Sequence, residues 1–198
     1  YFLKAKSEKE VTLEILDSKG GLVRTLSSVP EPQPWPIDDP DEGREEEAEA
    51  ELKNDAGVQR AFWDFRYEGA KKIWQAKIDM GDPGEGPLVS PGTYTVRLNV
   101  DGKSYSQPLV VSADPRVKMS ASDYENQLSL SLSLRDEVTR LTRMVEAIRA
   151  VRKQVVARKE LVKADETAAD WVKMADSLLS RLDAIEEKLH NPEAEVTY

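Results

Sequence analysis

The segment that most constrains the fold of this chain is residues 91–102, which read PGTYTVRLNVDG. A Pro-Gly turn opens the segment, an Asp-Gly turn closes it, and apolar and polar residues alternate between the two. Alternate side chains of an extended chain point to opposite sides, so this pattern predicts a strand with one face on a core and one in water. The residues expected on the core are Tyr94, Val96, Leu98 and Val100.

Neighbouring segments predict strands that share this sheet. Residues 11–16 (VTLEIL) and 22–26 (LVRTL) flank a loop with two glycines, which is typical of a β-hairpin. Residues 104–111 contain Pro108, and a proline that cannot donate to a ladder favours an edge position. Residues 1–4 predict a further short edge strand.

Aromatic residues are concentrated in residues 57–67, which read GVQRAFWDFRY. Apolar side chains occur on both faces of this segment, so it predicts a central strand whose outer side is also covered. Aromatic clusters are usually core, and we interpret this one as core. The alternative is a carbohydrate-stacking platform, for which the candidates are Trp35, Trp63 and Trp74.

Residues 27–56 predict an insertion in the sheet domain. Four prolines between positions 30 and 36 direct the chain out of the sheet, and ten acidic residues against two basic ones follow between Asp38 and Asp55. One interpretation is a solvated excursion with some helical character. The other is a calcium site, but the spacing of Asp39, Asp41 and Gly43 does not match a calcium loop.

Beyond residue 115 the sequence becomes helical, with almost no glycine or proline before Pro192. Ser122 and Asp123 are the expected N-cap residues of a helix of about 42 residues, roughly 60 Å long, and a break near residues 164–169 separates it from a shorter helix. Each helix carries an apolar seam at alternating steps of four and three residues. The seams are Leu134, Val138, Leu141, Val145 and Ile148 in the first helix, and Trp171, Ala175, Leu178, Leu182, Ile185 and Leu189 in the second.

Charge supports an antiparallel pairing of these two helices. Residues 135–163 contain nine basic and four acidic residues, whereas residues 165–190 contain seven acidic and three basic ones. Helices of opposite charge attract each other when they pack side by side. We therefore expect a helical hairpin.

Four leucines near the start of the first helix do not fit a single seam. Leu128, Leu130, Leu132 and Leu134 alternate with serines, so on a helix they lie on nearly opposite faces. The shorter second helix cannot cover both faces. These leucines are therefore the candidate residues for binding a protein partner.

Composition excludes several kinds of site. The chain has no cysteine, so it has no disulfide, thiolate zinc site or cysteine nucleophile. The net charge of −9 arises mostly from the insertion, and no basic face with interleaved aromatics suggests nucleic acid. No apolar run approaches the roughly 18 residues of a membrane helix. The only histidine, His190, ends the second helix, where a cation is favourable.

No catalytic motif or cofactor-binding loop stands out, so we expect neither an enzyme nor a bound cofactor. The sequence begins at Tyr1 rather than Met, and we interpret it as a processed product or a fragment. These expectations leave a structural or interaction role, with a carbohydrate-binding role as the alternative.

Three motifs in order resemble a known arrangement. They are VTLEILDSKGGLVRTL, GVQRAFWDFRYEG and GPLVSPGTYTVRLNVDGKSYSQPLVV, followed by Asp114, Pro115, Arg116 and the long helix. The chain resembles the Ig-like module, of the flagellar hook-capping or fibronectin III-like type, near the C-terminus of bacterial secreted proteins with sortilin-like or Asp-box (BNR) repeats. Many of those proteins are labelled glycosyl hydrolases, but the repeats themselves are absent here.

The strand and helix patterns together with the resemblance predict an all-β sandwich in residues 1–115, including the insertion at about 27–56, followed by an antiparallel helical hairpin in residues 116–198. The resemblance also implies export, so we expect a periplasmic or secreted protein. The expected function is a non-catalytic structural or protein-interaction module, an accessory subunit or appended domain of an extracytoplasmic assembly. The alternative is a carbohydrate-binding appendage of a glycosidase-like protein.

Overall fold

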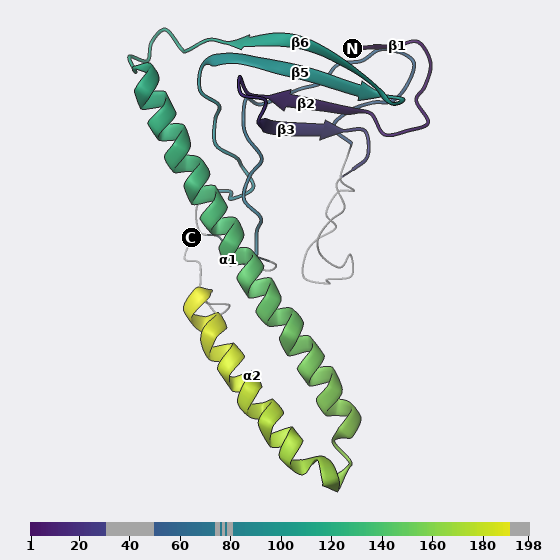
Figure 1. Cartoon of the computed structure of the whole chain (residues 1–198), viewed down its shortest axis with the longest axis vertical. Helices are drawn as coiled ribbons and strands as arrows, with labels where there is room; N and C mark the ends of the chain where they lie inside the picture. Colours follow the sequence, from purple (N-terminus) through teal and green to yellow (C-terminus); the bar gives the residue numbers. More distant parts are fainter. Residues whose placement is uncertain (31–49, 74–75, 77, 79–80, 191–198) are drawn as a thin grey trace. The chain divides into compact units, whose positions relative to one another are not determined.

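The computed structural model describes residues 1–30, 50–73, 76, 78 and 81–190. The described residues form six antiparallel strands in two sheets and two α-helices, so the chain is a mixed α and β protein (Figure 1). The chain divides into two compact units. The first comprises Tyr1–Glu68 and Gly86–Leu132, and the second comprises Gly69–Glu85 and Ser133–Tyr198.

The larger sheet of the first unit has the strand order β3, β2, β5, β6 (Figure 1). Its strands are β2 (Thr12–Leu16), β3 (Leu22–Ser27), β5 (Gly92–Val100) and β6 (Lys103–Val111). The predicted hairpin of β2 and β3 is confirmed, and the strand predicted in residues 91–102 is β5, an inner strand. Strand β6, which contains Pro108, ends the sheet as predicted.

The smaller sheet pairs β1 (Phe2–Leu3) with β4 (Gly57–Val58). It confirms a short strand in residues 1–4, but the prediction of a central strand through residues 57–67 is wrong. The strand ends at Val58, and further along Phe65 has a φ of 60° and the Asp64 carboxylate accepts the Arg66 N–H at 3.0 Å, so the chain turns there. Phe62 points outward and is 76% exposed, so the outer side of the segment is not covered as predicted.

The core of the first unit joins side chains from both sheets. Its buried residues are Leu3, Val11, Ile15, Val23, Leu26, Leu52 and Tyr94. The Tyr94 hydroxyl donates to the Ser90 carbonyl at 2.6 Å, and burial, followed by the charges of Tyr67 and Asp17, raises the pKa of Tyr94 to about 12. Tyr94 is thus the point at which β5 is anchored in the core.

Helix α1 (Ala121–Val162) begins with a capping box. Ser120 is the N-cap: its hydroxyl accepts the Asp123 N–H at 3.2 Å, and the Asp123 carboxylate accepts the Ser120 N–H at 3.0 Å. The prediction of Ser122 or Asp123 as the N-cap is therefore wrong. Asp123 instead supplies the reciprocal bond, and its hydrogen bonds with Ser120 lower the pKa of its carboxyl.

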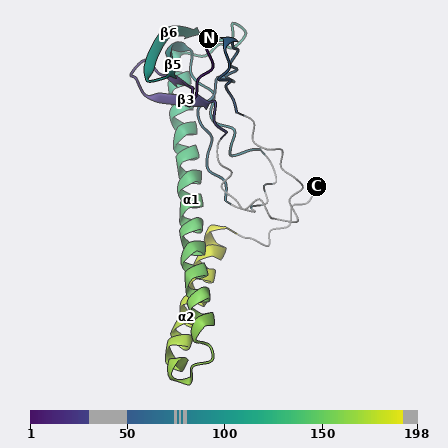
Figure 2. The ribbon, with the colours of Figure 1, turned by 90° about the vertical axis from the view of Figure 1, so that its right-hand side faces the viewer.

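A break separates α1 from the second helix, as predicted. The 3-10 helix η1 (Glu166–Ala168) leads into α2 (Ala169–Leu189), which runs alongside the second half of α1 (Figures 1 and 2). The part of α1 from Ser133 onward, α2 and the segment Gly69–Glu85 belong to the second unit. The predicted helical pair is thus present.

A polar network crosses the outer face of the larger sheet. The Arg97 Nε donates to the Glu14 carboxylate at 2.6 Å, and Asn99 donates to the same carboxylate at 3.0 Å. The hydrogen bond with Arg97 is the main cause that holds the pKa of Glu14 below its ordinary value of 4.5, while burial opposes it and Asn99 assists. The network joins β2 to β5 on the side away from the core.

We predict that Glu14→Gln destabilises the sheet in a pH-dependent way. Because the folded-state pKa is lowered, the stabilisation is complete above pH 4.5 and is lost as the pH falls through the lowered value. The expected loss of unfolding free energy at pH 7 is about 1 kcal/mol, since both partners are partly exposed. Urea unfolding followed by tryptophan fluorescence measures it. The control Glu8→Gln should change little, and an equal difference at pH 7 and pH 3 contradicts the prediction.

Candidate functional site

The four candidate leucines lie on α1, where they separate into two pairs. Leu128 and Leu132 are half-buried, whereas Leu130 and Leu134 are 63% and 59% exposed. Members of each pair are four residues apart and share a helix face. The exposed pair therefore offers two large apolar side chains at adjacent positions on one face of α1.

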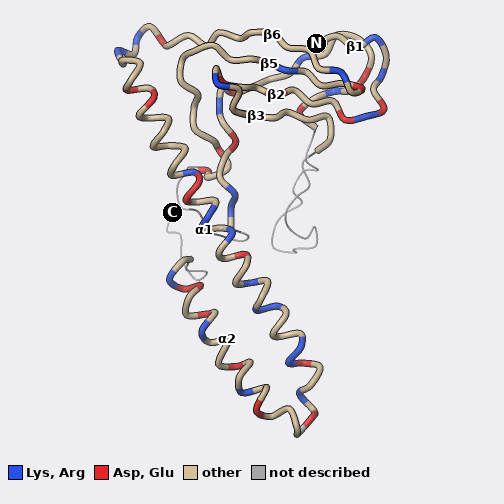
Figure 3. Tube along the Cα trace, viewed as in Figure 1, with Lys and Arg blue, Asp and Glu red and all other residues tan. Residues whose placement is uncertain are grey.

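Ion pairs fix how α1 and α2 face each other. Three pairs link the helices: Arg149 with Glu186, Arg152 with Asp183, and Lys159 with Asp176. From one ion pair to the next, the α1 partner moves forward by three and then seven residues, and the α2 partner moves backward by the same numbers. The helices are therefore antiparallel, and Figure 3 shows the basic and acidic positions along them.

The predicted seam of α2 divides into two sets of positions. Ala175 is buried and Leu182 and Leu189 are half-buried, each seven residues from the next. Trp171, Leu178 and Ile185, also seven residues apart, are exposed. The covered positions that alternate with the first set are instead Val172, Leu179 and Glu186, so the predicted seam of α2 is only half correct.

Glu186 is the most buried charged residue of the helical pair, with 6% of its surface exposed. One carboxylate oxygen accepts from Arg149 Nε at 2.7 Å, while the other is buried without a hydrogen-bond partner among the described residues. A buried carboxylate depends on its counter-ion, because an unpaired charge in the interior is costly. Arg149 and Glu186 therefore determine the register at the end of α2.

Two threonines of α1 hold the segment Gly69–Glu85 within the same unit. The Thr139 hydroxyl accepts the Lys71 N–H at 3.2 Å, and the Thr142 hydroxyl donates to the Lys71 carbonyl at 2.7 Å. Both backbone groups of Lys71 are thereby satisfied by side chains three residues apart on one helix. Thr142 is fully buried, so this contact is an internal one.

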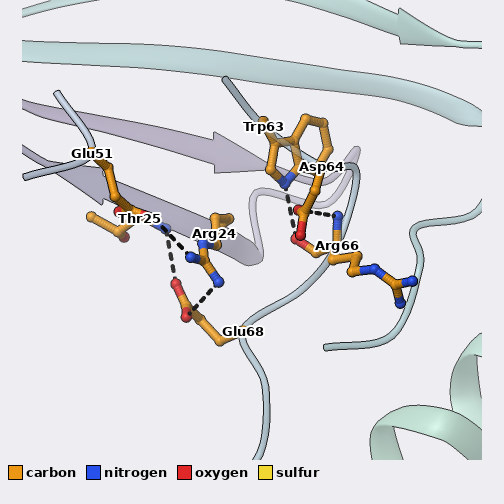
Figure 4. Close-up of polar contacts among 7 residues, drawn as sticks. All are labelled: Arg24, Thr25, Glu51, Trp63, Asp64, Arg66 and Glu68. Carbon is orange, nitrogen blue, oxygen red and sulfur yellow. Dashed lines mark hydrogen bonds and ion pairs between the residues drawn. The ribbon is translucent and has the colours of Figure 1, made fainter. Parts of the chain in front are cut away.

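An arginine-centred cluster connects three segments of the first unit (Figure 4). Arg24 on β3 donates to Glu51 at 2.8 Å and to Glu68 at 3.1 Å. Burial alone would lower the pKa of Arg24, but the bond to Glu51 and the charges of Glu68 and Asp64 raise it. Glu68 also accepts the Thr25 N–H at 3.3 Å, so the cluster secures the flanking segments to the sheet edge.

The three candidate tryptophans have different positions. Trp63 is half-buried: its Nε1 donates to the Arg66 carbonyl at 2.9 Å (Figure 4), and its ring lies 5.2 Å from Phe65 and 6.0 Å from Tyr94 between centroids. Trp35 and Trp74, like the acidic run between positions 31 and 49, lie outside the described residues. A stacking role for these tryptophans stays a prediction.

Three further observations bear on the kinds of site that the described residues carry. Within the described part of the chain, no group of three His, Cys, Asp or Glu side chains is placed to hold a metal ion. Among the same residues, no helix has the length and apolar character required to cross a membrane. His190 follows α2, as expected, and its N–H donates to the Glu186 carbonyl at 2.8 Å.

Comparison with known proteins adds no relative. No protein-family model, curated protein or solved structure matches the chain. Its function is therefore inferred from its own surfaces.

The sequence indicates the ion pairs between the helices in part, but it gives no indication of the threonine contacts with Lys71. The pairing of Arg149 with Glu186 follows from the opposite charges of the two helices, but the individual partners depend on a register that charge alone does not determine. The contact of Thr139 and Thr142 with Lys71 joins residues far apart in the sequence through a backbone group. No side-chain pattern identifies such a bond in advance.

We predict that Glu186→Ala lowers the unfolding free energy of the helical pair by about 2 kcal/mol. Loss of one partner of a fully buried pair costs roughly 3 to 5 kcal/mol, and the partly exposed Arg149 reduces that cost. Urea unfolding followed by the helical circular dichroism signal measures the change. The control Glu137→Ala removes an exposed pair with Arg140 and should cost less than about 0.5 kcal/mol. Equal effects of the two substitutions would falsify a special role for Glu186.

Proposed function

We propose that this chain is a non-catalytic structural and protein-interaction module. In this proposal the first unit is a β-sandwich of the Ig or fibronectin III-like kind, and the helical pair is a projecting or bracing arm that binds another protein. The module acts as an accessory subunit or appended domain of an extracytoplasmic assembly, periplasmic or secreted. Its proposed relatives are the modules that follow sortilin-like or Asp-box repeats in bacterial secreted proteins.

The observation that carries the proposal is the exposure of Leu130 and Leu134 on α1. Leucines are usually buried, and two on one helix face mark a surface that gains free energy when another protein covers it. Each fully covered leucine contributes roughly 1.5 to 3 kcal/mol.

The sandwich in the proposal is supported by the shared core. Leu3 of the small sheet and Ile15 of the large sheet lie in one hydrophobic cluster, as expected when two sheets pack face to face. The antiparallel larger sheet, polar on its outer face and apolar on its inner face, agrees with the same architecture. The extracytoplasmic location rests on the sequence resemblance.

The test is site-specific cross-linking in the native source. A photo-reactive residue at position 134 should capture a defined protein, whereas the same residue at the neighbouring exposed Ser133 should capture much less. The identified protein is then purified, and its affinity is measured with the full chain. Leu134→Asp should weaken binding at least tenfold, about 1.4 kcal/mol, and Ser133→Asp should not.

Two results would overturn the proposed function. One is turnover of a substrate by the purified chain. The other is equal cross-linking from positions 133 and 134, with the affinity of every captured protein unaffected by Leu134→Asp. Circular dichroism confirms that each variant retains its helices.

A further inference from the structure

The helical pair of the second unit carries an apolar stripe distinct from the candidate leucines. On α2 it consists of the exposed half of the predicted seam together with Met174, and on α1 it consists of two exposed residues seven positions apart. We define the apolar stripe as Met144, Val151, Trp171, Met174, Leu178 and Ile185. Met174 is 65% exposed and Ile185 is 48% exposed.

Burial shows that both parts of the stripe lie on one side of the pair. Met144 directly precedes the fully buried Val145, and Met174 directly precedes the buried Ala175, so each lies about 100° around its helix, in the same sense, from a buried residue. Antiparallel helices are related by an approximate two-fold axis normal to their common plane. Equal rotations around the two helices therefore lead to the same side.

The opposite side of the pair is charged. Glu146 directly follows the buried Val145 and Glu187 directly follows the buried Glu186, so both lie on the side away from the stripe. The pair is therefore amphipathic as a whole: one side is charged and the other is apolar. This is the surface distribution of a helical bundle that lacks its third helix.

Basic side chains border the stripe. Arg158 lies seven residues after Val151, and Arg181 and Lys188 each lie three residues after a stripe member of α2. All three are exposed, and none forms an ion pair with a described residue. The stripe is thus accompanied by positive charge on both helices.

The acidic residues of α2 do not neutralise this border. They are Asp170, Asp176, Asp183, Glu186 and Glu187. Asp176, Asp183 and Glu186 pair with α1, Asp170 in the first turn pairs with Lys173, and Glu187 lies on the charged side. A second copy of the chain would bring like charges together at the stripe, which disfavours self-association through it.

We propose that the apolar stripe is the docking groove for an amphipathic helix with acidic flanks, supplied by a partner protein. The partner's apolar face covers the stripe and completes a three-helix bundle, while its carboxylates pair with Arg158, Arg181 and Lys188. The inference rests on the proposed function only in requiring a protein partner. It concerns a surface other than Leu130 and Leu134, so either can fail without the other.

The test uses two synthetic helical peptides of about 20 residues, roughly the length of α2. Both carry leucines at positions i, i+3, i+4 and i+7, and one has glutamates and the other lysines on the flanks. Fluorescence anisotropy with the full chain measures affinity. The glutamate peptide should bind at least tenfold more tightly than the lysine peptide, and added salt should reduce the difference.

Variants assign the binding to the stripe. Ile185→Asp should weaken binding of the glutamate peptide at least tenfold, and the matched control Glu187→Gln on the opposite side should not. The double variant Arg181→Glu, Lys188→Glu should reverse the preference between the peptides. Because it changes exposed side chains only, this double variant tests the groove even if Ile185→Asp loses helical structure.

Three outcomes would overturn the inference. They are absence of binding, equal binding of the two peptides, and a dimer of the free chain that Ile185→Asp dissociates in light scattering. The last result would assign the stripe to a second copy of the chain.

Discussion

The register of α1 against α2 is the constraint on which the helical unit depends. Three ion pairs at matched steps determine which residues of each helix meet and therefore which remain outside. Exposed ion pairs contribute little to stability, but Glu186 is buried and its pairing with Arg149 discriminates strongly against other registers. A shift by one residue would rotate each helix by about 100° and separate the partners.

The sheet unit depends on a simpler principle. Alternating residues place Ile15 and Tyr94 in a core and place the network of Glu14 and Arg97 on the outer face. The two faces thus hold β2 against β5 in different ways, one by apolar burial and the other by charge-assisted hydrogen bonds. Strand β6 lies at the edge of the sheet, where Pro108 has no backbone N–H to donate and so disfavours the pairing of a further strand.

Much of this arrangement could be predicted from the sequence, because alternation and heptad spacing report directly on buried faces. The β-hairpin, β5, the helical pair and the break between its helices are all visible as patterns. The strand predicted through residues 57–67 is wrong because pairing stops at Val58 and the chain turns further along, at Phe65, and alternation indicates neither. The sequence does not distinguish the N-cap, because Ser120 and Ser122 lie two residues apart and are equally suitable.

The candidate surfaces were harder to predict. A seam at steps of three and four residues identifies apolar positions, but it does not reveal that Ala175 and Leu182 are covered while Leu178 and Ile185 stay exposed. That division depends on the number of helices that pack together, which a single sequence does not specify. Likewise, the alternating leucines indicate two helix faces but not which face is covered.

The account depends most on an α1–α2 pair whose stripe is open in the free chain. The absence of cysteine makes single-cysteine variants clean probes, and thiol-labelling rates measure accessibility at each position. Cysteines replacing Met174 and Ile185 should react at least tenfold faster than cysteines replacing Ala175 and Leu182. Equal protection at all four positions in the free monomer would contradict the account.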